Sequence, residues 1–258
     1  MPSFDKLAAI YDATRGLPAA EMQKVVGAIE RVLKEFGCKS LIDVGVGTGR
    51  FALPLSAIGF DVIGIDISKE MVRIAREKQF DNFLFSDARS MPFRDQSFDA
   101  ALAVHVLHLT ASWKLVVKEI CRVTKNVLIA SGVEVEGFSV RWQYYQMRQE
   151  LDKAFQEDGL AGGENELAKI IPPARTIIAS EHPESIEADR EIQFLENRGS
   201  SDSLETPTEI HKKIIENLKK EYAGKTFPRR RKELVYFWNI NDLRTSFEGK
   251  PEPVRDFV

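Results

Sequence analysis

The sequence is poor in the features that mark secreted, membrane-spanning or strongly charged proteins. Its 258 residues include two cysteines, Cys38 and Cys121, and no CxxC pair, so we expect buried free thiols in a reducing compartment. The N-terminus lacks the apolar region of a signal peptide, and no window reaches about 18 uninterrupted apolar residues. A net charge of −3 gives no general attraction to nucleic acid or to an anionic membrane. These absences favour a cytoplasmic protein.

What the sequence does contain is an alternation of apolar strands and amphipathic helices. Helical spacing of apolar residues, or a helix-starting pattern, is found at 21–36, 49–59, 68–78 and 113–123. Short apolar runs predict strands at 40–44, 60–66, 82–87, within 97–109, and at 125–132. This alternation with short links predicts βαβ units and a parallel sheet covered by helices on both faces.

After residue 133 the alternation stops. We expect a long helix at 138–159, a second near 164–171, a strand at 172–180, a charged helical stretch at 183–224 and a last strand at 232–240. The predicted fold is α/β: one Rossmann-like, doubly wound domain with a seven-stranded, mostly parallel sheet and a helical insertion before the last strand. Its parts are N-terminal cap helices (1–36), a ligand-binding core (37–132) and a variable segment (133–258).

A glycine-rich loop, "LIDVGVGTGRF", joins the first strand to a helix. Gly45, Gly47 and Gly49 favour close approach of the backbone to a ligand, because they have no Cβ atom. A P-loop would need Lys-Ser/Thr after the last glycine, and a dinucleotide fingerprint would need GxGxxG, with a glycine where Arg50 stands. Asp43 at the loop entrance would repel a pyrophosphate but suits an amine-bearing ligand.

Two further strands also end in aspartate. Asp66 closes the second strand about twenty residues after the loop, the position that holds ribose hydroxyls in a Rossmann crevice. Asp87 closes the third strand and would accept a hydrogen bond from an exocyclic amine. A single aspartate of this kind is usually a cap or turn former, but three on consecutive strands indicate a binding site.

These motifs resemble the class I S-adenosylmethionine-dependent methyltransferases (methyltransferase type 11), the broad group that includes quinone-biosynthesis enzymes. "DVGVGTG" is similar to their first motif, with Val46 in place of a frequent cysteine, and "GIDISKEMV" to the second. "SDARSMPFRDQSFDAALAVHVLHL" and "EICRVTKNVLIAS" are similar to the later ones, except that Lys125 and Asn126 stand where a proline and glycines are usual. The resemblance covers residues 36 to 132.

The resemblance implies S-adenosylmethionine as the cofactor and S-adenosylhomocysteine as its product. Gly45 and Gly47 would lie against the methionine part, while Asp43 and the carbonyl of Ala103 would bind its amino group.

The same resemblance places the adenosine part. Asp66 would bind both ribose hydroxyls, and Ile67 and Met71 would enclose the adenine ring. Asp87 would accept from the adenine amine, and Ala88 would pack at the ring.

Residues outside these motifs are weaker candidates. The N-terminal segment resembles a lead-in helix in which Tyr11 and Arg15 contact the amino-acid end; the alternative is an amphipathic helix with an exposed arginine. His105 and His108 follow the fourth strand, where either would act as a base or simply pack at the crevice rim. His182 and His211 in the variable segment have no partners at metal-ligand spacing, so no metal is assigned.

The variable segment carries two further patterns. Trp142, Tyr145 and Gln149 share a helix face, which would line an apolar or aromatic substrate pocket or pack as a lid. The basic cluster "PRRRKE" (228–233) is interpreted as a solvated strand lead-in rather than an RNA site, because no aromatic residues interleave with it.

The leading hypothesis is a methyltransferase acting on O, N or C of a small-molecule acceptor. The alternatives are a non-catalytic module that binds S-adenosylmethionine and, with less support, an RNA methyltransferase or an NAD(P)-dependent oxidoreductase. No membrane span is expected, and no motif specifies the acceptor or the oligomeric state.

Overall fold

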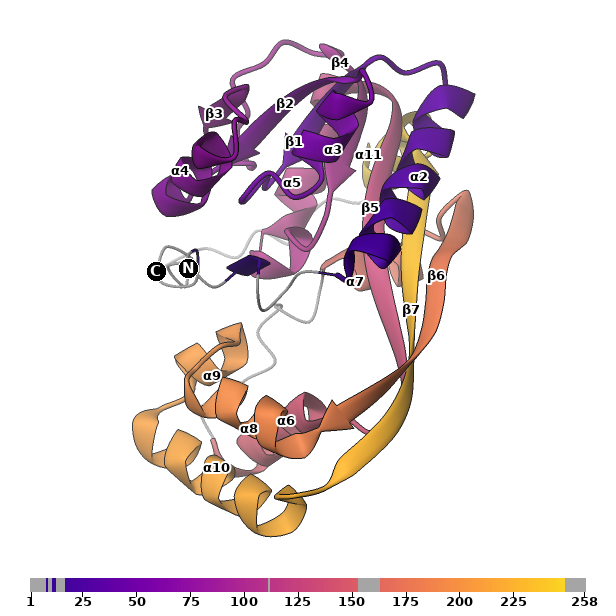
Figure 1. The fold of residues 1–258 in the computed structure, drawn as a ribbon. Helices are drawn as coiled ribbons and strands as arrows, with labels where there is room; N and C mark the ends of the chain where they lie inside the picture. Colours follow the sequence, from indigo (N-terminus) through magenta and orange to yellow (C-terminus); the bar gives the residue numbers. More distant parts are fainter. Residues whose placement is uncertain (1–7, 9–10, 13–16, 111, 153–162, 249–258) are drawn as a thin grey trace, which may run out of the picture.

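A seven-stranded sheet forms the centre of the molecule (Figure 1). The computed structural model describes residues 8, 11–12, 17–110, 112–152 and 163–248. The strands are β1 (Ser40–Val44), β2 (Asp61–Asp66), β3 (Phe83–Phe85), β4 (Phe98–Ala103), β5 (Thr124–Gly137), β6 (Arg175–Glu187) and β7 (Thr226–Asn239). Their order is β3-β2-β1-β4-β5-β7-β6, in which β7 is antiparallel to both neighbours and the other pairs are parallel. The predicted doubly wound, mostly parallel sheet is therefore confirmed.

Helices cover both faces of this sheet, because successive strand residues point to opposite sides. Leu41 packs in a core with α2 and α3, whereas its neighbour Ile42 packs in a second core with α5 and α11. The helices are α2 (Ala19–Glu35), α3 (Ala52–Ala57), α4 (Lys69–Glu77), η2 (Leu107–Leu109), α5 (Trp113–Val123), α6 (Val140–Leu151), α7 (Gly163–Ile170), α8 (Ala188–Glu196), α9 (Ser201–Glu205), α10 (Thr208–Tyr222) and α11 (Ile240–Glu248). Within these ranges no helix has both the length and the apolar character needed to cross a membrane.

Local sequence signals define several of these elements as expected. Gly37 ends α2 in the left-handed region, with φ of 63°, and the next residue returns a hydrogen bond to Leu33 across the helix end. Ser68 caps α4, its hydroxyl accepting a hydrogen bond from the Met71 amide at 3.2 Å. The two cysteines are buried free thiols.

The last three strands are longer than the sequence predicts. The apolar pattern ends β5 at 132 and β6 at 180 and begins β7 at 232, but all three strands continue as a curved three-stranded arm. The extensions are rich in charged residues, so they lack the apolar pattern of a buried strand. Pairs across the strands, such as Lys232 with Glu136 at 2.7 Å and Arg230 with Glu181 at 3.1 Å, accompany the backbone ladder.

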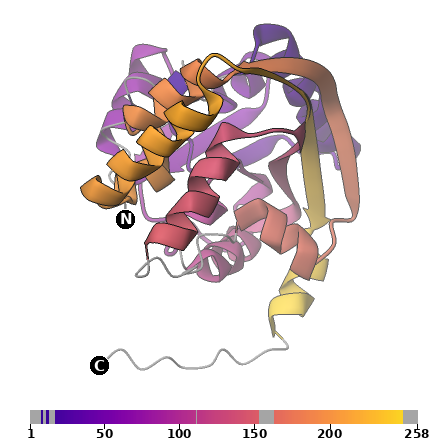
Figure 2. The ribbon, with the colours of Figure 1, turned by 90° about the horizontal axis from the view of Figure 1, so that it is seen from below.

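The arm carries a second, helical lobe made of α6, α8, α9 and α10 (Figures 1 and 2). The stretch predicted as a helical insertion, 183–224, contains α8 to α10, although 183–187 belongs to β6. The lobe has its own hydrophobic core, which includes Tyr144, Ile192 and Leu218. β5 runs parallel to β4 and leads directly into α6, so the lobe lies beyond the carboxyl ends of the parallel strands.

Candidate functional site

The glycine loop after β1 is built from backbone conformations that other residues rarely adopt. Gly45, Gly47 and Gly49 have φ of 73°, 55° and 78°. The amides of Gly45 and Val46 both donate to the carbonyl of Ile65, at 2.8 and 2.9 Å, and so tie the loop to β2. The loop therefore presents bare backbone at the carboxyl edge of the sheet.

Asp66, the last residue of β2, connects this loop to helix α4. Its Oδ2 accepts a hydrogen bond from the Gly47 amide and its Oδ1 accepts one from the Ser68 amide, both at 2.8 Å. An ionised carboxylate accepts about four hydrogen bonds, and these two amides account for two of them. The geometry is that of an oriented acceptor pair beside a glycine loop.

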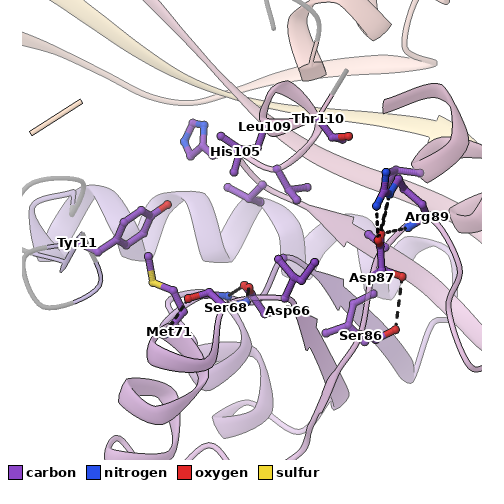
Figure 3. A pocket seen from close by; sticks show the side chains of 18 residues that line it. Tyr11, Asp66, Ser68, Met71, Ser86, Asp87, Arg89, His105, Leu109 and Thr110 are labelled. Carbon is purple, nitrogen blue, oxygen red and sulfur yellow. Dashed lines mark hydrogen bonds and ion pairs between the residues drawn. The ribbon is translucent and has the colours of Figure 1, made fainter. Parts of the chain in front are cut away.

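A cavity of about 300 Å³ opens at this edge (Figure 3). The sequence-predicted residues that line it are Tyr11, Gly45, Gly47, Asp66, Ile67, Met71, Asp87, Ala88 and His105. Tyr11, Met71 and His105 lie at one end, Asp87 and Arg89 at the other, and Asp66 between them. Asp43, Ala103 and His108 are not among the lining residues, and Arg15 lies outside the described residues.

Asp43 lies beneath the loop, with 3% of its surface exposed. Burial raises the pKa of its carboxyl to about 7; the negative charge of Asp66 adds to this rise and the charge of Arg50 opposes it. The side chain therefore holds a proton more readily than an ordinary aspartate, and a cation bound nearby would favour its ionised form.

Asp87 at the end of β3 is paired with Arg89, which the sequence predictions did not include. Arg89 donates from Nε to both carboxylate oxygens at 3.1 Å and from Nη2 at 2.7 Å, and its own amide donates at 2.8 Å. These hydrogen bonds hold the pKa of Asp87 below its usual range. The only local signal was the arginine two residues further on in "SDARS".

The turn after β4 forms the wall opposite Asp66. His105 has φ of 55°, a strained conformation for a residue with a side chain and one that is frequent at functional sites. The turn is held from outside by Glu164 of α7, whose Oε1 accepts from the amides of Val106 at 2.8 Å and Leu107 at 3.2 Å. Glu164 Oε2 lies 3.4 Å from His108 Nδ1, so His108 faces α7 while His105 lines the cavity.

The aromatic face predicted on α6 is present but does not line this cavity. Trp142 is 54% exposed and stacks on Tyr145 with ring centroids 5.4 Å apart, and Gln149 donates to the Tyr145 hydroxyl at 3.1 Å. These residues lie opposite the buried Val140 and Tyr144, which pack in the lobe core. Among the described residues, no group of three His, Cys, Asp or Glu side chains is placed to hold a metal ion.

Known proteins match part of this chain. Residues 42–127 match the family model described as a methyltransferase domain. A demethylmenaquinone methyltransferase from Renibacterium salmoninarum is 31% identical over 128 residues, which is 47% of this chain and 52% of that protein. A malonyl-[acyl-carrier protein] O-methyltransferase from Erwinia pyrifoliae is 34% identical over 133 residues, covering 48% and 50%. The match thus spans about half the length of these relatives.

The fold has a solved counterpart over most of the chain. The structure of a candidate type II methyltransferase from Anaeromyxobacter dehalogenans superposes with a TM-score of 0.54 at 16% identity, covering 83% of this chain and 95% of that one. At this identity the likeness establishes a shared fold and leaves the chemistry to the site itself.

Proposed function

We propose, from the premise that residues 42–127 form a domain of the methyltransferase family, that the protein transfers a methyl group from S-adenosylmethionine to a small molecule. The observation that carries the proposal is the carboxylate of Asp66, fixed between the Gly47 and Ser68 amides at the middle of the cavity. A fixed acceptor pair of this kind matches the two vicinal hydroxyls of a ribose.

The adenine part would occupy the end of the cavity at Asp87. Ile67 is a large apolar side chain left 49% exposed beside the cavity, so a flat ring packed against it would remove apolar surface from water. Met71 also lines the cavity but lies toward the end away from Asp87, so enclosure of the ring by both side chains stays a prediction from the sequence. Ala88 would pack at the ring edge. Asp87 would accept from the exocyclic amine while Arg89 keeps its charge balanced.

The methionine part would lie along the glycine loop. At Gly47 the position that a Cβ atom would take is open, with the Gly45 carbonyl oxygen the nearest atom at 3.9 Å, which leaves room for a ligand. At Gly45 the same position is filled by Val106, so this glycine allows the turn after β4 to approach the loop. Asp43 and the carbonyl of Ala103 do not line the cavity, so they would attract the amino group, which is cationic at neutral pH, through the cavity wall rather than by direct contact. Tyr11 lines the same end of the cavity, and Arg15 is proposed to pair with the carboxylate.

Methyl transfer requires no covalent intermediate with the protein. When bound, S-adenosylmethionine would supply an activated methyl carbon; a lone pair of the acceptor would form a bond to this carbon in line as the C–S bond breaks and its electron pair stays on sulfur. The residues of this chain hold the two partners in line and exclude water. His105, at the same end of the cavity as Tyr11, would accept the proton of an acceptor that arrives protonated. His108 is not given that role, because its ring faces Glu164.

The helical lobe is proposed to cover the acceptor, since it lies beyond the carboxyl ends of the strands that form the cavity. The two relatives described above carry the names of different acceptors, so the acceptor is a property of the individual protein. An RNA acceptor gains no support from "PRRRKE", because Arg229, Arg230 and Arg231 each pair with a glutamate of the arm.

Two measurements test the proposal. Calorimetry should show binding of S-adenosylhomocysteine and no binding of NAD(P), since the loop lacks the third glycine of a dinucleotide fingerprint. Transfer of label from methyl-labelled S-adenosylmethionine into a small-molecule extract would then identify the acceptor. Binding without transfer into any extract would favour the non-catalytic module, and NAD(P) binding alone would refute the proposal.

A further inference from the structure

The wall of the cavity after β4 depends on a residue that is distant in the sequence. The backbone from Val104 to Val106 is irregular and leads into the short 3-10 helix η2, so the amides of Val106 and Leu107 stand at a helix start where no helical carbonyl accepts from them. Both amides donate instead to one oxygen of Glu164, from 2.8 and 3.2 Å. Glu164 lies in the first turn of α7. This helix follows the family core, by which we mean residues 42–127 that match the methyltransferase family model.

Glu164 is buried, with 4% of its surface exposed. Burying a carboxylate is costly unless its oxygens are hydrogen-bonded, and here two backbone amides and His108 supply the donors. Burial alone would raise the pKa of Glu164, but the hydrogen bond from His108 and the charges of His108 and His105 outweigh it, so the pKa is lowered. The group thus acts as an anionic acceptor aimed at the turn.

Close packing links α7, the turn and the glycine loop in one line of contacts. A Cβ atom on Gly163, the first residue of α7, would lie 2.6 Å from Cβ of His108. On the other side of the turn, a Cβ atom on Gly45 would lie 2.6 Å from Cγ2 of Val106. A displacement of the turn after β4 would therefore move the cavity wall and also disturb the glycine loop that packs against Val106.

We propose that Glu164 is a positioning residue for the cofactor cavity, holding Val106 against the glycine loop and His105 in its left-handed conformation. The inference rests on the proposed function, because it assigns the consequence to S-adenosylmethionine binding. It also means that the segment after the family core completes the cavity, so residues 42–127 do not form it alone.

The alternative is that Glu164 merely stabilises α7. Two substitutions of Glu164, by glutamine and by alanine, distinguish these two roles. In E164Q the amide oxygen still accepts from Val106 and Leu107, whereas E164A leaves both donors without an acceptor. A residue that only supports α7 would change thermal stability and leave ligand affinity unchanged.

The test measures calorimetric affinity for S-adenosylhomocysteine and amide hydrogen exchange in the wild type, E164A, E164Q and E166A. Glu166 is the matched control, a half-buried glutamate of the same helix. We expect E164A to weaken binding by roughly tenfold and to expose the Val106 and Leu107 amides to exchange. E164Q should recover most of the affinity, and E166A should match the wild type.

Unchanged affinity in E164A, or equal losses in E164Q and E164A, would overturn the inference. If E164A does not fold, E164Q carries the test: protected Val106 and Leu107 amides with near-wild-type affinity support the role, and loss of either overturns it. A wild type that binds no S-adenosylhomocysteine would instead overturn the proposed function, which separates the two failures.

Discussion

Asp43 is a buried carboxyl whose ionisation lowers stability and which we propose to serve ligand binding. Its pKa of about 7 means that the folded protein without ligand retains a proton that the unfolded chain has lost above its ordinary range near 4. Between these values the folded state binds more protons, so the contribution of Asp43 to the free energy of unfolding falls as pH rises from about 4 to about 7. A cation bound beside the carboxyl would lower this pKa and so favour the ionised form at neutral pH.

Replacing Asp43 with asparagine should therefore separate stability from binding. We expect Asp43→Asn to be more stable than the wild type at pH 8, by up to about 4 kcal/mol, with the difference vanishing near pH 4. Its affinity for S-adenosylhomocysteine should fall, because the ligand ammonium loses its carboxylate. Urea unfolding at both pH values and calorimetry check this, and a variant that loses stability at pH 8 would show that Asp43 is paired and ionised in the free protein.

Site residues were predictable from the sequence when their contacts are close in the chain, and were not predictable when the contacting residues are far apart in the chain. Asp66 and Gly47 lie within one strand–loop–helix–strand unit, from β1 to β2, and the short motifs at its two ends therefore revealed them. Arg89 left a weak signal because arginine beside aspartate is common on surfaces. Glu164 left none, since its contact with Val106 spans 58 residues and depends on where the chain folds back after the core.

At the scale of elements, the strand–loop–helix unit that begins with β1 is the most constrained part of the molecule. Its three glycines adopt left-handed conformations, and the space at Gly45 is already filled by Val106. By contrast Gly27, in the middle of α2, has no atom within 4 Å of the position that a Cβ atom would take, and its φ is not unusual. The two glycines therefore differ in what a single added methyl group would do.

Gly45→Ala should weaken S-adenosylhomocysteine binding by more than about tenfold and lower stability by about 1–3 kcal/mol, because it adds both strain and overlap. Gly27→Ala should leave binding unchanged and raise stability by up to about 1 kcal/mol, because it favours the helix. Calorimetry and urea titration of the pair check this. Equal affinity of the two variants for S-adenosylhomocysteine would show that the glycine loop is not part of the binding site.

The boundaries of strands were predicted well where burial of apolar residues determines them. They were predicted poorly where pairing with a neighbouring strand determines them. β1 and β4 lie inside the sheet and were found from their apolar runs. The ends of β5, β6 and β7 carry alternating charges, and their strand conformation depends on partners far along the chain, such as Glu136 beside Lys232. No local propensity in "PRRRKE" indicates a strand of that length.

At the scale of the whole molecule, the protein consists of a sheet core and a helical lobe joined by the arm of β5, β6 and β7. The lobe has a separate hydrophobic core, and Phe138 packs at its base with its ring centroid 4.0 Å from that of Phe227 and 4.9 Å from that of Tyr222. Separate cores joined by a narrow arm favour local unfolding of one part.

Phe138→Ala should destabilise the lobe selectively. We expect amides of α6, α8 and α10 to lose about 2 kcal/mol of protection against hydrogen exchange, while those of β1 and β4 keep theirs. The control is Ile178→Ala on the arm, where the side chain is 57% exposed. A uniform loss of protection across sheet and lobe would mean that the molecule unfolds as one unit.

The central claim, that Asp66 binds the ribose of S-adenosylmethionine, has a direct measurement. Calorimetry with S-adenosylhomocysteine would compare the wild type with Asp66→Asn and with Asp61→Asn, the exposed aspartate at the opposite end of the same strand. We predict that Asp66→Asn loses more than about 1 kcal/mol of binding free energy, at least fivefold in affinity, because charge-assisted hydrogen bonds are lost, while Asp61→Asn binds like the wild type. Equal affinity of Asp66→Asn and the wild type would contradict the account.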